Sequence, residues 1–234
     1  MSPTGLRVAA LYDIHGNLPA LNAVLADVDA DLILVGGDIA AGPWPSETLE
    51  RLRELGERAR FIRGNADREV ADGTEGLAPP EIVNFVRERL SPEQISFLGS
   101  LPLTQSVEVD GLGLVLFCHA TPRNDEEVFT RISPDASWQA ALAGVREQVV
   151  VCGHTHVQFE RRIGDVRLVN AGSVGMPYES EPGAYWALLG PDVQFHRTAY
   201  EPGDLAASGW PEEWPEATAE EATEFFERMS REQR

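Results

Sequence analysis

Lysine is absent from this chain of 234 residues, so all 19 of its basic residues are arginine. Without a lysine amine, the chain can neither form a Schiff base with a carbonyl substrate nor hold phosphate as a P-loop does. Basic charge is also scarce overall, because 38 acidic residues leave a formal net charge of −19 at pH 7. Nucleic acids and anionic membranes attract basic surfaces, so the composition argues against binding to either.

Cysteine is almost absent as well. The two cysteines, Cys118 and Cys152, each lie inside an apolar run. No apolar stretch approaches the roughly 20 residues of a membrane-spanning helix, and no signal peptide is evident. We therefore expect buried free thiols, a cytoplasmic location and no membrane association. A disulfide stays open as an alternative that nothing in the sequence requires.

The remaining composition is that of a globular protein. Hydrophobic residues make up 43% of the chain, which at this length allows a substantial core in one large or two small domains. Most of the acidic excess is expected on solvated surface, although it also suits a site that gathers carboxylates around cations. We divide the chain into a domain of residues 1–200 and an acidic, aromatic-containing C-terminal extension of residues 201–234, with a helix over about residues 217–229.

The first part of the chain alternates short apolar runs with amphipathic segments. Apolar runs predict strands over residues 6–12, 32–35 and 59–62. Between them, apolar residues at helical spacing predict helices over residues 18–28 and 45–56. This βαβαβ order is typical of a parallel or mixed sheet covered by helices.

The second part of the chain is richer in hairpins. Turn residues separate paired apolar runs at residues 106–109 and 112–118, 157–163 and 166–169, and 184–189 and 193–198. A further strand is expected over residues 149–152. Both parts fit one α/β protein whose two sheets stack face to face with helices outside.

Residues able to bind metals follow directly after the predicted strands. They include four of the five histidines, and the full set is Asp13, His15, Asp38, Asn65, His119, His154 and His156. Ligands of open α/β sheets bind beyond the carboxyl ends of the strands, so these side chains are expected to converge. Each histidine alone would be an ordinary core or surface residue, but together with two aspartates and an asparagine they indicate a metal site.

The ligand types indicate which metals. Imidazoles and carboxylates without thiolates suit Mn, Fe, Zn or Ni better than a structural zinc. Seven donors exceed the needs of one tetrahedral ion and suit two ions that share a carboxylate. Residues i and i+2 of a strand point the same way, so Asp13 and His15 are expected on one ion, whereas His154 and His156 of a loop can reach different ions. Two ions about 3.5–4 Å apart clamp a phosphate and lower the pKa of a bridging water.

The segments Asp13-x-His15, Gly37-Asp38, Gly64-Asn65, His119 and Gly153-His154-x-His156 resemble, in this order, the motif set of the calcineurin-like metallophosphoesterases. The resemblance spans about residues 6–199. DIHGNLPALNAVL, GDIAAGPWP and NAGSVGMP are most similar to the small bacterial and archaeal phosphodiesterases, a branch near the diadenosine tetraphosphatases. The resemblance implies a four-layer αββα sandwich built on two mixed sheets. It also implies two bound metal ions, with Mn preferred over Fe, Zn or Ni.

The resemblance also implies roles for single residues. The first ion would be bound by Asp13, His15 and His156, the second by Asn65, His119 and His154, with Asp38 as the bridge. Asp38, Asn65 and His119 are thereby the catalytic candidates.

Candidates for binding the substrate's phosphate oxygens are Asn65, Arg63 and Arg123, because a guanidinium fork matches phosphate geometry. Arg68 is a further candidate, for which a surface ion pair is at least as good an interpretation. Asn17 and Ser173 could shape the backbone near the metals.

One position departs from the family pattern. Gly64-Asn65 is turn chemistry in which the glycine allows a sharp turn, and many members have a histidine next, where this chain has Ala66. An alkoxide leaving group needs a proton, whereas an aryl oxide or a phosphate leaves with metal help alone. Phosphodiesters, cyclic nucleotides and phosphoanhydrides are therefore better candidates than monoesters. Asp67 could substitute as the acid, or instead face solvent or orient a metal-bound histidine.

Our first interpretation is a dinuclear-metal phosphodiesterase that hydrolyses a small phosphoester or nucleotide with a metal-bridging hydroxide. The alternative is a dinucleoside polyphosphate hydrolase; a protein phosphatase is disfavoured by Ala66. A non-catalytic scaffold, like the metallophosphoesterase-like subunit of retromer, would not need all seven donors. A homo-oligomer stays open, as does a protein contact through the extension, whose expected docking residues are Trp210, Trp214, Phe225 and Phe226.

Overall fold

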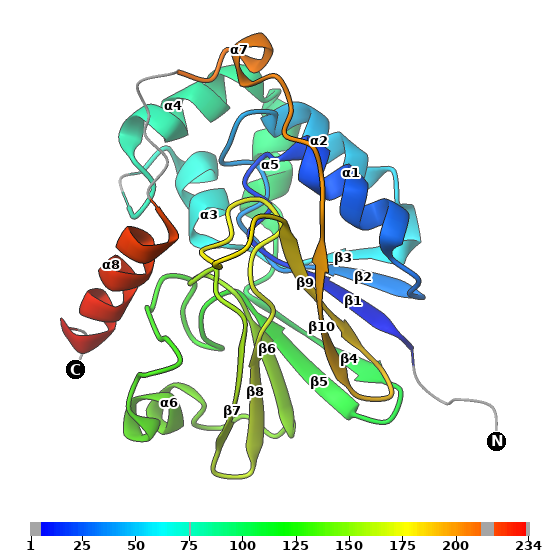
Figure 1. Ribbon diagram of the computed structural model, residues 1–234, viewed down its shortest axis with the longest axis vertical. Coiled ribbons are helices and arrows are strands. Elements are labelled where there is room, and N and C mark those ends of the chain that lie inside the picture. The colour runs from blue at the N-terminus through cyan, green and yellow to red at the C-terminus, as the bar shows by residue number, and fades with distance from the viewer. Residues whose placement is uncertain (1–5, 75, 212–217, 233–234) are drawn as a thin grey trace.

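Ten strands form two five-stranded sheets in the computed structural model, which describes residues 6–74, 76–211 and 218–232 (Figure 1). The first sheet has the order β10-β9-β1-β2-β3. Its strands are β1 (Val8–Leu11), β2 (Leu32–Val35), β3 (Ala59–Phe61), β9 (Ala184–Leu189) and β10 (Val193–Thr198). The second sheet has the order β4-β5-β6-β8-β7. Its strands are β4 (Thr104–Val109), β5 (Gly113–Cys118), β6 (Val149–Cys152), β7 (Phe159–Ile163) and β8 (Val166–Asn170).

Both sheets are mixed. In the first, β1, β2 and β3 are parallel, while β9 runs antiparallel to β1 and β10 antiparallel to β9. Helices α1 (Leu18–Asp27) and α2 (Pro45–Arg53) make the parallel crossovers, as the βαβαβ prediction requires. In the second sheet, β5, β6 and β8 are parallel, and β4 and β7 are antiparallel edges. Each sheet therefore contains three parallel strands, six in all. Five of these six, β1, β2, β3, β5 and β6, are followed directly by the predicted metal-binding residues.

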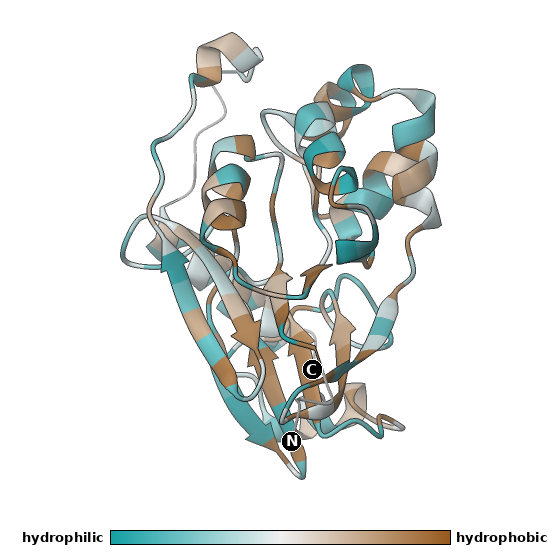
Figure 2. Cartoon of the chain, turned by 90° about the vertical axis from the view of Figure 1, so that its right-hand side faces the viewer, coloured by the Kyte–Doolittle hydropathy of each residue, from teal (hydrophilic) through white to brown (hydrophobic). Residues whose placement is uncertain are grey.

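The core explains why the strands are apolar throughout. Along β1, Val8 and Ala10 belong to the cluster between the two sheets, whereas Ala9 and Leu11 pack under the helices. A third cluster on the outer face of the second sheet contains Trp138 of helix α6 (Asp135–Ala141). In Figure 2 the central strands are accordingly mostly hydrophobic, while the outer helices show both colours. The predicted four-layer αββα sandwich is confirmed.

Several helices were not predicted. They are α3 (Asn65–Asp72), α4 (Pro80–Arg89), α5 (Pro92–Ser100), α6 and the short α7 (Leu205–Ser208). The predicted helix over residues 45–56 ends at Arg53, and a 3₁₀ turn, η1 (Gly56–Arg58), precedes β3. The most consequential difference is α3, because it begins at Asn65, where the sequence suggested only a turn.

The C-terminal extension contains a helix close to the expected position, α8 (Ala219–Glu232); residue 217 of the predicted range lies outside the described residues. Trp210 packs edge-to-face on Phe85 of α4, with ring centroids 5.2 Å apart. Trp214 also lies outside the described residues. The boundary at residue 200 stays a prediction.

The two cysteines are buried and free, as expected. Among the described residues, no helix is both long and apolar enough to cross a membrane.

Candidate metal centre

Seven predicted ligands gather where the loops after β1, β2, β3, β5 and β6 meet. All seven are almost inaccessible to solvent; the most exposed, His15, retains 9% of its accessible surface. The residues are Asp13, His15, Asp38, Asn65, His119, His154 and His156. Segments more than a hundred residues apart in the chain thus share one small polar cluster inside the molecule.

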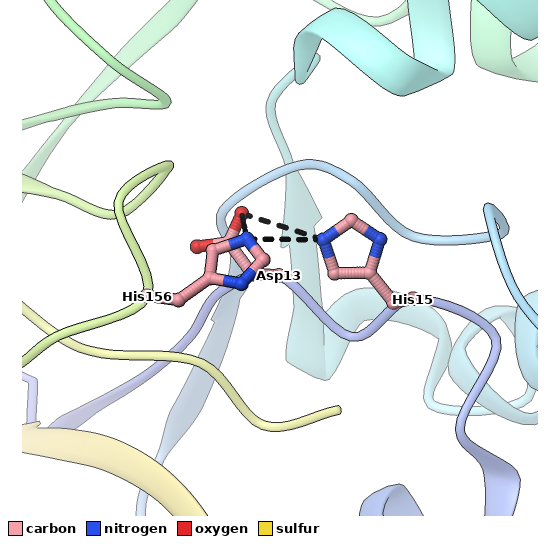
Figure 3. A group of neighbouring side chains, drawn as sticks. All are labelled: Asp13, His15 and His156. Carbon is pink, nitrogen blue, oxygen red and sulfur yellow. Dashed lines mark hydrogen bonds and ion pairs between the residues drawn. The ribbon is translucent and has the colours of Figure 1, made fainter. Parts of the chain in front are cut away.

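The first group consists of Asp13, His15 and His156 (Figure 3). Their potential ligand atoms all lie within 4.8 Å of one another. Nε2 of His15 is 3.1 Å from Nε2 of His156, and Oδ1 of Asp13 is 3.4 Å from Nε2 of His156. The three side chains point toward a common centre, as ligands of one ion do.

The second group consists of Asp38, His119 and His154, whose potential ligand atoms also lie within 4.8 Å of one another. Oδ2 of Asp38 is 3.5 Å from Nε2 of His119 in this group. The same oxygen is 3.8 Å from Nε2 of His15 in the first group. Asp38 therefore lies within 4 Å of histidines of both groups, as does Asp13, whose Oδ1 is 3.8 Å from Nε2 of His119.

Three of the histidines have their tautomers set by main-chain carbonyls. Nδ1 lies 3.2 Å from a carbonyl oxygen in His15, 2.9 Å in His119 and 2.6 Å in His156. A carbonyl oxygen only accepts, so Nδ1 must carry the hydrogen and donate it. Nε2 is then the nitrogen of each ring that is directed at the other ligands, which is how metal-bound histidines are oriented.

Unpartnered buried atoms supply an independent test of whether the residues fit metal ions. Oδ1 of Asp13, Oδ1 of Asn65 and Nε2 of His154 are buried and have no hydrogen-bond partner among the described residues. Buried polar atoms are ordinarily satisfied. Three lone-pair donors left unsatisfied in one place fit a pair of cations.

The orientation of the Asn65 amide is fixed by Glu69, which is itself fully buried. Nδ2 of Asn65 donates to Oε1 of Glu69 over 3.1 Å. A carboxylate only accepts, so the amide nitrogen must face Glu69 and Oδ1 must face away from it. Glu69 also accepts from the main-chain N–H groups of Leu77 and Ala78, which holds the carboxylate in place.

The backbone of the site is strained. Among the described residues, the non-glycine residues with positive φ all belong to this cluster: Asp13 (50°), His15 (46°), Asp38 (51°), His154 (67°) and His156 (59°). Each such conformation costs about 1–3 kcal/mol and persists only where the surroundings enforce it. The strand alternation that we used to place Asp13 beside His15 is therefore the wrong reason, because β1 ends at Leu11 and both residues lie in a left-handed loop.

Gly64 is needed for close approach and not for the turn that we expected it to provide. Its φ of −94° is open to any residue. A Cβ at this position would lie 2.1 Å from Oδ1 of Asp38. The missing side chain lets the start of α3 contact Asp38, whose Oδ1 accepts from the main-chain N–H of Ala66 over 2.8 Å.

Asp67 turns inward and binds the main chain. Its Oδ2 accepts from the N–H groups of Asp38 (2.8 Å) and Gly64 (3.0 Å). Its Oδ1 accepts from the N–H of Ile39 over 2.9 Å. The carboxylate is buried, and burial together with the nearby Asp38 raises the pKa of Asp67 to about 7. Asp67 neither faces solvent nor orients a histidine; it holds the loop that carries Asp38.

The two buried carboxylates make the cluster electrostatically favourable for a cation. Burial lowers the pKa of His119, but the carboxylates of Asp38 and Asp13 outweigh it and raise this pKa to about 10. Burial and the neighbouring His119 lower the pKa of His154 to about 4. Without metal, the raised pKa of His119 favours one positive charge beside two buried carboxylates, which leaves the cluster with an excess of negative charge.

The predicted phosphate-binding arginines are all paired with carboxylates. Nε of Arg63 is 3.0 Å and Nε of Arg68 3.2 Å from Oδ2 of Asp125. Arg123 is half-exposed and binds Glu127 at 2.6 Å. Arg68 therefore forms an ion pair, which was the alternative interpretation to phosphate binding for this residue. Contacts of Arg63 and Arg123 with a substrate stay predictions.

Two further predicted residues shape the backbone. Oδ1 of Asn17 accepts from the N–H of Ala20 and caps α1. Oγ of Ser173 donates to the carbonyl of Asp13 over 2.7 Å and accepts from the N–H of Met176 over 2.8 Å. Since the Met176 carbonyl accepts from His156, Ser173 connects the loops of two residues of the first group.

Comparison with known proteins identifies the family. Residues 6–190 match the model of the calcineurin-like phosphoesterase superfamily domain, so the chain belongs to this superfamily. Phosphodiesterase YfcE of Escherichia coli K12 is 26% identical over 78% of this chain and 87% of its own. A symmetrical bis(5'-nucleosyl)-tetraphosphatase of Janthinobacterium is 32% identical over 40% of this chain and 38% of its own. A metallophosphoesterase structure from Sphaerobacter thermophilus is 26% identical with a TM-score of 0.73, covering 94% of this chain and 98% of its own.

The predicted resemblance is thereby confirmed, and the chain is a hydrolase of phosphate esters. The Asp/His groups described above could hold the metal ions on which the activity of this family depends.

Proposed function

We propose that this chain is a dinuclear-metal phosphodiesterase. Asp13, His15 and His156 would hold the first ion and Asn65, His119 and His154 the second, with Asp38 between them. The observation that carries the proposal is the pair of neighbouring three-residue groups, joined by carboxylates that reach across: Asp38 Oδ2 is 3.8 Å from His15 Nε2 and Asp13 Oδ1 is 3.8 Å from His119 Nε2. The relative named as a phosphodiesterase supports the same activity.

The bound ions would neutralise charge on the phosphate and lower the pKa of a water between them. The chain supplies rigid positioning for them. Asp38 is held through its side chain by the Ala66 N–H and through its main chain by Asp67. Asn65 is held by Glu69, so that its oxygen faces the cluster. Preorganised ligands of this kind require little rearrangement during the reaction.

The preference for diesters rests on the residues after Asn65. Ala66 has no proton to give, and both oxygens of Asp67 already accept from main-chain N–H groups. Neither residue is arranged to protonate a leaving oxygen. Esters with acidic leaving groups, such as aryl oxides or phosphates, are therefore better substrates than alkyl monoesters.

Hydrolysis of a dinucleoside polyphosphate is the second candidate, because its leaving group is a phosphate. The similarity to a tetraphosphatase supports it over 40% of this chain. For the metal we propose Mn ahead of Fe, Zn or Ni, since mixed imidazole and oxygen ligands without thiolate suit these ions. A cytoplasmic location, a homo-oligomer and a partner contact through the extension stay predictions.

The test is activity of Mn-reconstituted protein against an aryl phosphodiester, an aryl phosphomonoester, a cyclic nucleotide and a dinucleoside tetraphosphate. We expect diesterase activity that exceeds monoesterase activity. Asp38→Ala should abolish turnover, while Asp72→Ala, an exposed aspartate at the end of α3, should not. Retained activity in Asp38→Ala would refute the assignment of the site, and a monoester preference would refute the inference from Ala66.

A further inference from the structure

Helix α8 places one aromatic side chain inward and its neighbour outward. The inward face carries Ala222, Phe226 and Ser230, spaced four residues apart, and Ala222 and Ser230 are buried. Phe225 points more toward solvent and retains 42% of its accessible surface, although its ring lies 5.4 Å from that of Phe226. Side chains four apart share one face of a helix, so α8 packs on the rest of the molecule through this stripe.

The stripe docks on the candidate metal centre. The ring centroid of Phe226 lies 6.0 Å from that of His154 and 6.1 Å from that of His156. It also lies 5.9 Å from the ring of Tyr178, which stacks on His156 at 4.7 Å. Phe226 thus belongs to an aromatic cluster that covers both histidines of the Gly153–His156 loop.

This packing closes one side of the site. Thr155, between the two histidines, shares a narrow crevice with Thr223 and Phe226 of α8. His154 and His156 each retain 4% of their accessible surface, whereas His15, away from these contacts, retains 9%. His15 is thus the most exposed of the three, and α8 covers the side of the site formed by His154 and His156.

We propose that Phe226 is a specificity-determining residue that closes the His154–His156 side and limits the size of the ester groups accepted at phosphorus. The inference rests on the proposed phosphodiesterase function. The ring of Phe226 occupies the space directly against the two imidazoles, 6.0 and 6.1 Å from their centroids. Its role is to exclude bulky groups, and small diesters are the substrates that the closed site fits.

The first measurement needs no metal. Diethyl pyrocarbonate modifies accessible imidazoles, and mass spectrometry of the peptide of residues 147–161 reports on His154 and His156. In metal-free protein, Phe226→Ala should raise the modification rate about tenfold by weakening the local packing. Phe225→Ala removes the same ring from the exposed side of the same turn, where it touches only the edge of Phe226, and should raise the rate far less than Phe226→Ala does.

The second measurement compares two aryl diesters that share a nitrophenolate leaving group and carry either a methyl or a nucleoside group as the other ester. Phe226→Ala should raise kcat/KM for the nucleoside diester relative to the methyl diester about tenfold, a size typical of shape discrimination in a pocket. Phe225→Ala should leave this ratio unchanged. Phe226→Leu keeps apolar contact with the imidazoles and should give an intermediate ratio. Because it is the milder substitution, it also shows whether the effect of Phe226→Ala arises from unfolding.

The two failures are distinguishable. If the native protein hydrolyses neither diester, the proposed function is wrong. If it hydrolyses them and Phe226→Ala matches Phe225→Ala in modification rate or in substrate ratio, the role of Phe226 is overturned.

Discussion

Replacing Asp67 by asparagine separates a positioning residue from a proton donor. The native carboxylate accepts three main-chain hydrogen bonds, at 2.8, 2.9 and 3.0 Å, from Asp38, Ile39 and Gly64. Asparagine has one acceptor oxygen and one NH₂ group, so at least one of these N–H groups would face a donor. The change leaves the size of the side chain nearly the same, which limits its effect to these bonds.

The magnitude follows from the count of bonds. At a pH well above the raised pKa of Asp67, where the carboxylate is charged, each hydrogen bond to it contributes about 1.5–3 kcal/mol, so losing one and neutralising the acceptor of two more should destabilise the fold by about 3–5 kcal/mol. Relief of the repulsion with Asp38, which contributes to the raised pKa of Asp67, offsets part of this. We expect a net loss of about 2–3 kcal/mol, which a typical domain survives. The Asp38 loop, held at a φ of 51°, should also loosen.

The assay has two arms. Denaturant unfolding of metal-free protein should show Asp67→Asn destabilised relative to Asp72→Asn, the same change at an exposed position of α3. With Mn bound, a series of diesters of rising leaving-group pKa should lose activity uniformly in Asp67→Asn. A stability within about 0.5 kcal/mol of the Asp72 variant, together with a selective loss for poor leaving groups, would refute positioning and identify Asp67 as the acid.

Three further outcomes are expected. Glu69→Gln can turn an NH₂ group toward Asn65 and should weaken the second metal site about tenfold, seen in calorimetry as two unequal affinities; two sites of native affinity would contradict the role of Glu69. Ala66→His should raise monoesterase relative to diesterase activity, and an unchanged ratio in a folded variant would show that this imidazole is not limiting. Metal binding at pH 8 should release a proton from His119, whose pKa near 10 keeps it charged, and calorimetry in buffers of different ionisation enthalpy should detect it; absence of release would contradict the raised pKa.

The sequence alone was enough for the layers of the fold and for the identity of the candidate ligands. Strands buried on both faces are apolar throughout, and the residues that follow them must lie at the carboxyl edge of the sheet. For this reason the set of candidate ligands, His119 and His154 included, could be recognised from the positions of its members after the predicted strands. Helix α3 was missed because Gly-Asn suits a turn as well as a helix start, and periodicity over eight residues is weak.

Only the tertiary structure determined the backbone conformation of the site, the direction of Asp67 and the docking of α8, because these depend on contacts between segments distant in the chain. The left-handed backbone of five residues in the site is enforced by distant main-chain partners, such as the Gly37 carbonyl that accepts from Asp13. The inward turn of Asp67 depends on a loop 28 residues away. The docking of Phe226 on His154 joins segments whose separation no local pattern records. Local physics placed the donors at strand ends, and long-range packing decided how they are grouped, held and covered.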